Sequence, residues 1–344
     1  MEAEFLIVIF LAVFVDLTLG EFPLSFHPVV LMGIFIEKIG RGFLTNSKIK
    51  NRFLGFLLTI FMAALFSSFF YIILYFSSFN NVFYLLIASF LLSTTFAIKS
   101  LLKSVAEVAN NLAEDLKKAQ EAVSFLVSRD TSQFSSAEVA SAAIETLTEN
   151  VNDSVIAPLF YIFIFGVLGW VLEVIYSSSY SSFYLGFGSL VIRWSTYHFP
   201  VMFGVTAGVS YRVVNTLDAM VGYKDPKNVD IGFFPARLDD CLNYIPARIS
   251  GVLLVVSSFF IGSKYKHAWQ VMLDEAHHTP SPNSGYPMAA AAGALGVQLI
   301  KPQVYKLGDS LYPLTNAKIS EAIKLSIITI TLFLAIILTI LLIL

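Results

Sequence analysis

Four long apolar runs place the strongest constraint on what this chain can fold into. They cover Leu54–Phe76, Val82–Ile98, Val155–Tyr176 and Leu325–Leu344, and the last contains no charged residue. A helix needs about 20 mostly apolar residues to cross the hydrocarbon core of a bilayer. The chain is 56% hydrophobic and only 13% charged over 344 residues, which excludes an ordinary soluble domain. We therefore predict an all-α, polytopic helical membrane protein.

Three other apolar segments are shorter or interrupted. Phe5–Leu19 carries Asp16 near its end, and Ile249–Gly262 gains length if its helix begins near Pro246. Tyr197–Val214 contains a proline and two glycines, which favour a broken or re-entrant helix. We therefore expect broken or re-entrant segments among the spans.

The basic residues indicate an orientation, because lysine and arginine are enriched in cytoplasmic loops. They cluster between Phe5–Leu19 and Leu54–Phe76 and again after Val82–Ile98. They are Lys38, Arg41, Lys48, Lys50, Arg52, Lys99, Lys103, Lys117, Lys118 and Arg129. The segment 264–324 adds six lysines. It lies on the same side if Gly285–Ile300 is re-entrant or if 249–262 does not cross the membrane. We expect a multi-pass protein of the cell membrane, with its N-terminus outside and its active site on the cytoplasmic side.

The chain is predicted to form a single integral membrane domain over residues 1–344, because it shows no internal repeat and no low-complexity tract. Residues 99–154 are expected to form a cytoplasmic helical insertion between two spans. The polar segments 215–248 and 264–324 are expected to be loops that carry functional residues.

Two amphipathic helices are predicted within the insertion. Apolar side chains recur at three- and four-residue steps from Val105 to Leu126, the periodicity of a helix with one buried face. Ser135 and Glu138 match a capping box, which indicates that a second helix begins there.

Composition and motifs exclude several functions. The formal net charge is −2, so nothing favours nucleic acid as a partner. Cys241 is the single cysteine, which excludes an intrachain disulfide and a cysteine-rich metal site. Neither the P-loop pattern G-x-x-x-x-G-K-[ST] nor the pattern G-x-S-x-G occurs. Asp274, His277 and His278 supply too few ligands to favour a zinc site.

A stripe of carboxylates leads into the apolar run that begins at Val155. Glu145, Glu149 and Asp153 step by four residues and would share one helix face, with Asn152 beside them. Three carboxylates repel one another unless a cation lies between them, and Mg²⁺ prefers oxygen ligands. The stripe therefore predicts a magnesium site, with a solvated helix face as the alternative.

A second polar cluster runs from Arg237 to Arg248, at the start of an apolar segment. Charged groups beside a membrane carry a desolvation cost, so they usually have a function. Pro246 is expected to end one helix and begin the next, which puts Arg248 in the first turn of the second helix. The unpaired N–H groups of that turn favour an anion. We expect the two arginines to hold a phosphate or a carboxylate, with a simple positive-inside anchor as the alternative.

Pairs of polar residues near this cluster could share helix faces. Adjacent aspartates diverge on a helix, and we expect Asp240 rather than Asp239 to lie on the face of Asn243. Asn215 and Asp218 are three residues apart and would share one face of another helix, where they could belong to a site. The alternative is that they cap the end of this helix where it leaves the membrane.

Three further candidates lie outside these helices. Ser281 and Asn283 occur in a stretch rich in proline and glycine, after which a helix is expected to begin near Pro287. His27 follows the first apolar segment, where a structural hydrogen bond is the more common role of a lone histidine.

Motifs spread from residue 16 to residue 297 occur in an order that is highly specific for one family, although each motif alone is not. They are Asp16-Leu-Thr-Leu-Gly-Glu21, His27-Pro-Val-Val-Leu-Met-Gly33, Ser128-Arg-Asp130, Glu145-Thr-Leu-Thr-Glu-Asn150 with Asp153, Ala157-Pro-Leu-Phe-Tyr161, Asn215-Thr-Leu-Asp-Ala-Met-Val-Gly-Tyr223, Ala236-Arg-Leu-Asp-Asp240 with Asn243-Tyr-Ile-Pro-Ala-Arg248, and Ser281-Pro-Asn283 through Gly293-Ala-Leu-Gly-Val297. Together they resemble the CobD/CbiB family of cobalamin biosynthesis. The chain departs from the family pattern by extra residues around Tyr176–Pro200.

The resemblance implies an integral membrane enzyme, adenosylcobinamide-phosphate synthase. This activity joins the free propionate of adenosylcobyric acid to (R)-1-aminopropan-2-ol or its O-phosphate, giving adenosylcobinamide or its phosphate. The expected cofactors are ATP, as co-substrate, and Mg²⁺. Expected partners are the lipid bilayer, other membrane-bound enzymes of corrinoid synthesis and a second copy of the chain. A membrane corrinoid transporter and a non-catalytic membrane sensor of the same fold are the alternatives.

Residue roles follow as hypotheses, because amide formation from a carboxylate needs activation, charge stabilisation and a base. The metal ligands would be Glu145, Glu149 and Asp153. Substrate and phosphate would be bound by Arg237, Arg248, Asn215, Ser281, Asn283, His27 and Arg129. The catalytic residues would be Asp218, Asp240 and Asn243.

Overall fold

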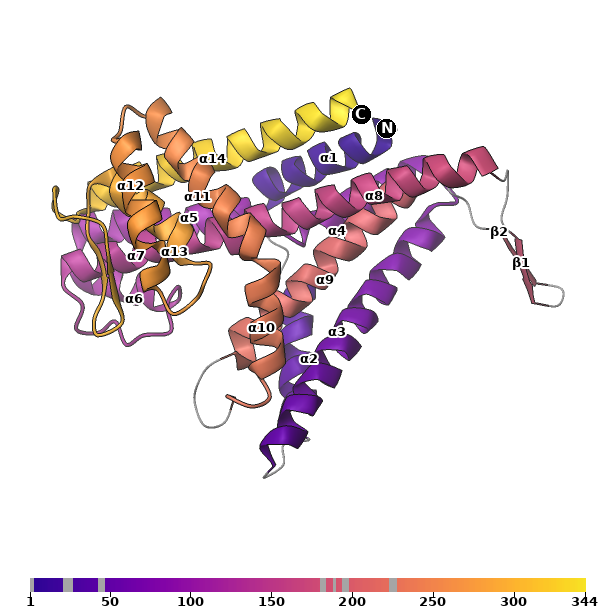
Figure 1. The fold of residues 1–344 in the computed structure, drawn as a ribbon, viewed down its shortest axis with the longest axis horizontal. Helices are drawn as coiled ribbons and strands as arrows, with labels where there is room; N and C mark the ends of the chain where they lie inside the picture. Colours follow the sequence, from indigo (N-terminus) through magenta and orange to yellow (C-terminus); the bar gives the residue numbers. More distant parts are fainter. Residues whose placement is uncertain are drawn as a thin grey trace. The chain divides into compact units, whose positions relative to one another are not determined.

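The computed structural model describes residues 3–20, 27–42, 47–179, 184–187, 190–193, 198–222 and 228–344 (Figure 1). The described chain is helical in most of its length. The helices are α1 (Ala3–Leu19), α2 (Pro28–Gly42), α3 (Lys48–Ser77), α4 (Asn81–Ser93), α5 (Ile98–Glu114), α6 (Leu116–Ser124), α7 (Ser136–Val151), a π-helical turn (Asn152–Ile156), α8 (Ala157–Ser179), α9 (Phe199–Val221), α10 (Phe233–Leu242), α11 (Tyr244–Phe260), α12 (Tyr265–Glu275), a 3₁₀ turn (Ala276–His278), α13 (Gly285–Leu295) and α14 (Asn316–Ile343). Two short antiparallel hairpins pair β1 (Tyr184–Phe187) with β2 (Leu190–Arg193) and β3 (Leu299–Lys301) with β4 (Tyr305–Leu307).

The predicted membrane spans are confirmed as long apolar helices. Four helical stretches of the described chain are long and apolar enough to cross a membrane, namely Lys48–Ser77, Asn81–Glu114, Ser136–Ile175 and Asn316–Ile343. Each contains or overlaps one of the four apolar runs. The pair α10 and α11 passes the same test with a bend of 46°, so it is either a broken span or a re-entrant loop. The fold is therefore an all-α, polytopic helical membrane protein.

The chain divides into two compact units, each built from separate stretches of sequence. The first comprises Met1–Phe96, Pro158–Ala236 and Thr339–Leu344, and the second comprises Ala97–Ala157 and Arg237–Leu338. The predicted helical insertion, residues 99–154, lies wholly within the second unit. That both units act as one integral membrane domain stays a prediction.

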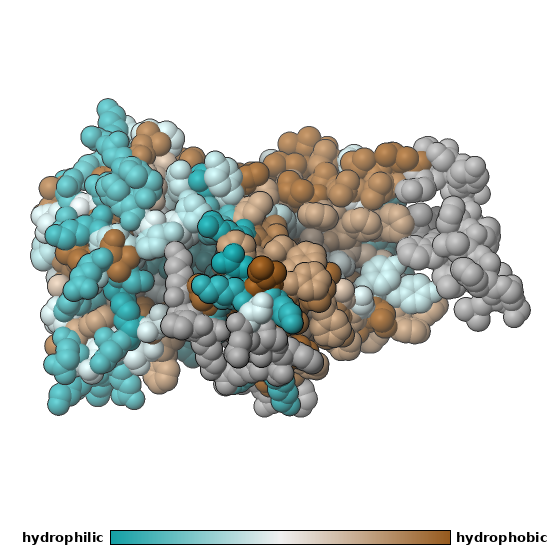
Figure 2. Space-filling model, turned by 60° about the horizontal axis from the view of Figure 1, so that its bottom comes forward, coloured by the Kyte–Doolittle hydropathy of each residue, from teal (hydrophilic) through white to brown (hydrophobic). Residues whose placement is uncertain are grey.

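Aromatic and aliphatic side chains cover the outside of the helices in the first unit. Phe10, Phe69 and Phe76 are each more than half exposed, as lipid-facing side chains are when no membrane is present. Figure 2 shows this part of the surface in brown, the colour of hydrophobic residues. Inside the unit, α1 packs on α4, and α3 packs on α9. The exposed apolar side chains on the outside of these helices account for much of the chain's hydrophobic composition.

Helix α9 is continuous, so the prediction of a broken helix at Tyr197–Val214 is wrong. Pro200 lies in the first turn, where its missing N–H is not needed for the helix. A Cβ atom at Gly204 would lie 3.0 Å from the carbonyl oxygen of Ile162, and one at Gly208 would lie 2.8 Å from Ile162 Cγ1. These glycines therefore allow α9 to approach α8 closely instead of interrupting it.

The helical insertion differs from its prediction at one point. The amphipathic segment is two helices, α5 and α6, which pack against each other. The break falls at Asp115, whose extended backbone ends α5 and whose carboxylate accepts a 2.8 Å hydrogen bond from Lys117 N. The predicted capping box is confirmed, because Ser135 Oγ accepts from Glu138 N while the Glu138 carboxylate accepts from Ser135 N.

The core of the second unit is the small-residue helix α13, which begins close to where it was predicted. Its side chains are almost all buried, and it packs against α7, α11 and α12. The segments 215–248 and 264–324, expected as loops, are largely helical, since they contain α10, α12 and α13. Polar groups on these segments are therefore held on rigid elements.

The close approach of α8 and α9 generates a prediction. Gly204→Leu should lower the stability of the protein by about 1–3 kcal/mol, because the added side chain has no room beside Ile162 and Phe5. Thermal unfolding of purified protein in detergent would measure the effect. Ala207→Leu, on a partly exposed position of the same helix, is the matched control. Equal melting temperatures for the two variants would contradict the packing role of Gly204.

Candidate functional site

A buried chain of hydrogen-bonded polar side chains connects three elements of the second unit. Asn152 Nδ2 donates to Asn243 Oδ1 at 3.0 Å and to Asp153 Oδ1 at 2.7 Å, and Asn243 Nδ2 donates to Asp239 Oδ2 at 3.0 Å. Asn152 Oδ1 accepts from Ser250 Oγ at 2.9 Å. Asn152 and Asn243 are each 2% exposed. This polar chain therefore places two carboxylates at the ends of a pair of fixed amides.

The π-helical turn explains how Asn152 reaches this position. The turn begins at Asn152, directly after α7, and continues to Ile156 before α8 resumes a normal helix. The extra residue of a π turn rotates the following side chains relative to a regular helix, and such turns are frequent at functional sites. Asp153 is therefore off the regular four-residue step from Glu145 and Glu149 that the sequence predicts.

The break between α10 and α11 places the other half of the polar chain. Asn243 separates the two helices, and Pro246 lies in the first turn of α11, as predicted. The expectation that Asp240 would share the face of Asn243 is wrong. Asp239 makes that contact, because it is four residues before Asn243 and only 8% exposed. The Asp240 side chain is 30% exposed instead, and lies 4.0 Å from the Arg237 guanidinium.

Arg248 is held between two aromatic rings beside this break. Its guanidinium carbon lies 3.5 Å from the centroid of the Tyr244 ring and 4.2 Å from that of Tyr286. Arg248 is one residue beyond the first turn of α11, but its side chain folds back so that Nη1 donates to Tyr244 O at 2.6 Å. The cation is therefore held near the start of the helix by aromatic and carbonyl contacts, and no carboxylate of the described residues forms an ion pair with it.

Asn283 ties Arg248 to the end of α10. Its Oδ1 accepts from Arg248 Nη1 at 3.0 Å, and its Nδ2 donates to Asp240 O at 2.7 Å. Ser281 has a local role, because its Oγ accepts from the backbone N–H groups of Asn283 and Ser284. The loop before α13 thus supports the arginine through Asn283, while Ser281 shapes the loop.

Glu145 is the centre of a second buried cluster. Its carboxylate is 2.9 Å from Arg129 Nη2 and accepts hydrogen bonds of 2.7 Å from Ser141 Oγ and Tyr305 Oη. The residue is 3% exposed. Burial and the neighbouring Glu145 raise the pKa of the Tyr305 hydroxyl above its ordinary value, so it stays a proton donor. Ser141 Oγ also accepts from Ile300 N, which joins strand β3 to α7.

The carboxylates do not form the predicted three-residue metal site. In the part of the chain that the structure describes, no group of three or more His, Cys, Asp or Glu side chains is arranged to hold a metal ion. Glu145 does not fit a metal ligand, because its oxygens are already bound to Arg129, Ser141 and Tyr305. Glu149 and Asp153 are partly exposed.

Three predicted site residues belong to the first unit, whereas the polar chain belongs to the second. His27 Nδ1 accepts from Val29 N at 3.2 Å, which caps the start of α2. Asn215 and Asp218 lie on α9, where Arg212 Nη1 is 3.4 Å from Asn215 Oδ1. The second unit holds the other predicted residues, Arg129, Glu145, Glu149, Asp153, Arg237, Asp240, Asn243, Arg248, Ser281 and Asn283.

Sequence reasoning missed several members of the two clusters. Asp239 could have been found from its four-residue spacing to Asn243, which is the better helical contact. Tyr286 and Tyr305 carry no local signal, because their partners are distant along the chain. Ser250 looks like any small residue of an apolar helix.

Comparison with known proteins identifies the family. A family model described as CobD/Cbib protein matches residues 9–182 and 183–327. The two parts of this match meet inside the stretch Tyr176–Pro200, part of which lies outside the described residues. With the buried polar site on a helical membrane fold, this match shows that the chain belongs to the CobD/CbiB family.

Curated relatives agree over nearly the full chain. The "Probable cobalamin biosynthesis protein CobD" of Methanothermobacter thermautotrophicus is 44% identical over 326 residues, covering 95% of this chain and 94% of the relative. The protein of the same name from Methanocaldococcus jannaschii is 37% identical and covers 88% of each chain. The "Cobalamin biosynthesis protein CobD" of Dehalococcoides mccartyi is 35% identical, covering 94% of this chain and 92% of the relative. No solved structure matches the chain.

These findings support a role in cobalamin biosynthesis for a protein with apolar, membrane-type helices. They also indicate a biosynthetic enzyme, in line with the resemblance seen in the sequence.

The Glu145 cluster generates a stability prediction. Arg129→Leu should lower the free energy of unfolding by about 3–5 kcal/mol, because it leaves a buried carboxylate without its counter-ion. Arg237→Leu should change it by less than about 1 kcal/mol, since Arg237 is 72% exposed and its ion pair is long. Denaturation in detergent, followed by tryptophan fluorescence, compares them. Similar losses in both variants would show that the Glu145 cluster is not a stabilising one.

Proposed function

We propose that this protein is an adenosylcobinamide-phosphate synthase, an amide-forming carbon–nitrogen ligase. It joins the free propionate of adenosylcobyric acid to (R)-1-aminopropan-2-ol or its O-phosphate at the cytoplasmic face of the cell membrane. The observation that carries the proposal is the polar chain of Asp239, Asn243, Asn152 and Asp153, with Arg248 beside it, in a member of the CobD/CbiB family.

The reaction needs a carboxylate to become a good electrophile. In the proposed reaction, the propionate oxygen attacks the terminal phosphorus of ATP, which releases ADP and leaves an acyl phosphate. The amine nitrogen then attacks the acyl carbon, phosphate leaves, and the extra proton of the nitrogen passes to a base. The net products are the amide, ADP and phosphate. Both steps develop negative charge on oxygen, so they require fixed cations and hydrogen-bond donors.

Two arginines of the second unit suit that requirement in different ways. Arg248 is pre-positioned by Tyr244, Tyr286 and Asn283, so little side-chain entropy is lost when an anion binds to it. Arg237 is mostly exposed, so it can reach a large substrate from the surface. We assign binding of the transferred ATP phosphate to Arg248 and binding of the corrinoid carboxylate to Arg237.

The base in this proposal is Asp240. Its side chain is partly exposed and its neighbour Arg237 keeps a cation within 4.0 Å. Asp239 and Asn243 take a positioning role, because both are buried and bonded to each other. Asn215 and His27 stay proposed substrate-binding residues, and Asp218 stays a proposed catalytic residue.

Mg²⁺ belongs to the proposal as the companion of the nucleotide. This ion usually binds through one or two carboxylates together with substrate phosphates, so a complete protein cage is not required. Glu149 and Asp153 would supply those carboxylates, and the ion would neutralise charge on the phosphates. Glu145 is excluded from that set by its pairing with Arg129.

The alternative of a corrinoid transporter has lost its main sequence support. That support was the broken helix expected at Tyr197–Val214, which is a continuous helix. The bent pair α10 and α11 remains the one such feature found in the described chain, and it carries the polar residues that catalysis needs. A non-catalytic sensor would not need Arg248 pre-positioned beside a carboxylate chain.

The direct test is turnover by purified protein. Incubation with adenosylcobyric acid, aminopropanol phosphate, ATP and Mg²⁺ should produce the amide, detected by its mass, together with ADP. Release of unchanged corrinoid across a vesicle membrane, without the amide, would favour the transporter instead.

Two variants probe the charged groups. Glu149→Gln and Arg248→Ala should each reduce amide formation by about a hundredfold or more, while protein yield stays normal. Glu114→Gln, an exposed carboxylate on α5, is the control for the first change. Arg248→Lys keeps a charge but cannot keep the planar contacts with both tyrosines, so it should also be impaired. Wild-type turnover in Glu149→Gln and in Arg248→Ala would refute these assignments.

The adjacent aspartates should differ in how they affect the reaction. Asp240→Asn should lower kcat and remove the acidic limb of its pH profile, since the proposed base is lost. Asp239→Asn should instead lower thermal stability together with activity, because it disturbs the bond to buried Asn243. Interchanged effects would assign the base to Asp239.

A further inference from the structure

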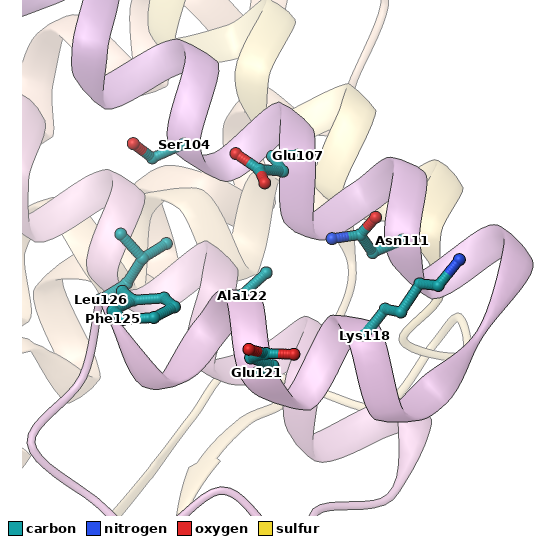
Figure 3. A pocket seen from close by; sticks show the side chains of 8 residues that line it. All are labelled: Ser104, Glu107, Asn111, Lys118, Glu121, Ala122, Phe125 and Leu126. Carbon is teal, nitrogen blue, oxygen red and sulfur yellow. The ribbon is translucent and has the colours of Figure 1, made fainter.

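The surface between α5 and α6 contains a pocket whose lining includes none of the residues that the proposed reaction assigns. Its volume is about 340 Å³, which is within the range of small-molecule sites. The lining residues are Ser104, Glu107, Asn111, Lys118, Glu121, Ala122, Phe125 and Leu126 (Figure 3). The pocket lies wholly within the second unit.

Apolar, acidic and basic side chains follow one another along the length of the pocket. Figure 3 shows Ser104 near Leu126 and Phe125 at one end, and Asn111 near Lys118 at the other. The carboxylates of Glu107 and Glu121 come from opposite helices between these ends. A ligand therefore meets, in sequence, an apolar surface, a pair of carboxylates and an ammonium group.

The three charges in the pocket do not neutralise one another. Within the described part of the chain, Glu107, Glu121 and Lys118 take part in no ion pair. Two carboxylates from facing helices attract a cation between them, and an unpaired lysine close by attracts an anion. Lys118 and Glu121 are three residues apart on one helix, a spacing at which such pairs commonly meet. Because they do not meet, both remain available to a ligand.

We propose that this pocket binds a phosphorylated amino alcohol. The ammonium group would lie between Glu107 and Glu121, and the phosphate would contact Lys118 and Asn111. The short carbon chain would pack on Ala122 and Phe125, whose ring is 82% exposed. Such a zwitterion matches the order of charges, whereas a simple cation would leave Lys118 without an anion.

This chemistry has two possible sources. One is the free amine substrate, and that assignment rests on the function proposed above. The other is the headgroup of phosphatidylethanolamine in the bilayer. The pocket is also connected to the Glu145 cluster, because Leu126 O accepts a 3.1 Å hydrogen bond from Thr146 Oγ1, one residue after Glu145. A ligand seated here would contact α5 and α6, which both pack against α7, the helix that carries Glu145.

Calorimetric titration of the full-length protein in detergent tests the proposal, without corrinoid or nucleotide. The probes are O-phosphoethanolamine and aminopropanol phosphate, compared with ethanolamine and inorganic phosphate alone. The zwitterions should bind more tightly than either half. Glu107→Gln and Lys118→Ala should each weaken binding by about tenfold or more, as expected for loss of a charge-assisted contact. Glu114→Gln and Lys117→Ala, which alter exposed neighbours outside the pocket, should leave binding unchanged.

Nanodiscs separate the two sources of ligand. If phosphatidylethanolamine nanodiscs prevent binding of the free zwitterion and phosphatidylcholine nanodiscs do not, the lipid headgroup is the occupant. If the free zwitterion binds equally in both, the soluble amine is the occupant. No binding of either zwitterion, or binding unaffected by Glu107→Gln and Lys118→Ala, would overturn the proposal. The titration measures binding and not a reaction. Its result can therefore be interpreted even if the protein does not form the amide.

Discussion

Burial of Asn152 is the constraint on which the arrangement of the second unit depends. An amide in a protein interior costs free energy unless its donors and acceptor are bonded. Asn152 satisfies both through Asp153, Asn243 and Ser250, which belong to its own π turn, the α10–α11 break and α11. Moving any of these elements would leave the amide unsatisfied. The same bonds hold Asp153 and Asp239 at the two ends of the polar chain.

The fold was largely predictable from the sequence, because crossing a bilayer requires long apolar runs and nothing else in the chain imitates them. The capping box at Ser135 and the helix break before Pro246 were predictable for the same local reason. Local patterns misled at Tyr197–Val214, where the glycines serve packing against Ile162 instead of breaking the helix. Whether a glycine breaks a helix or packs it depends on a neighbour that the sequence does not place.

The site was predictable in its residue types more than in its contacts. Arg248, Asn243 and Asn283 were identified, but the choice of Asp240 over Asp239 failed because an exposed face and a buried face look alike along one helix. Glu145 looked like a metal ligand because its partners, Arg129 and Tyr305, are far from it in sequence. Long-range pairing of this kind decides whether a carboxylate is available to a ligand.

The second unit is assembled from two stretches, Ala97–Ala157 and Arg237–Leu338, and this has a consequence for biogenesis. During synthesis, Asn152 emerges well before its partners Asn243 and Ser250. Glu145 emerges with Arg129 and Ser141 but well before Tyr305. A buried carboxylate or amide is costly until its partners arrive. These polar groups therefore stay incompletely bonded while α8 and α9 of the first unit are made. The order of translation thus makes the polar site one of the last parts of the protein to close.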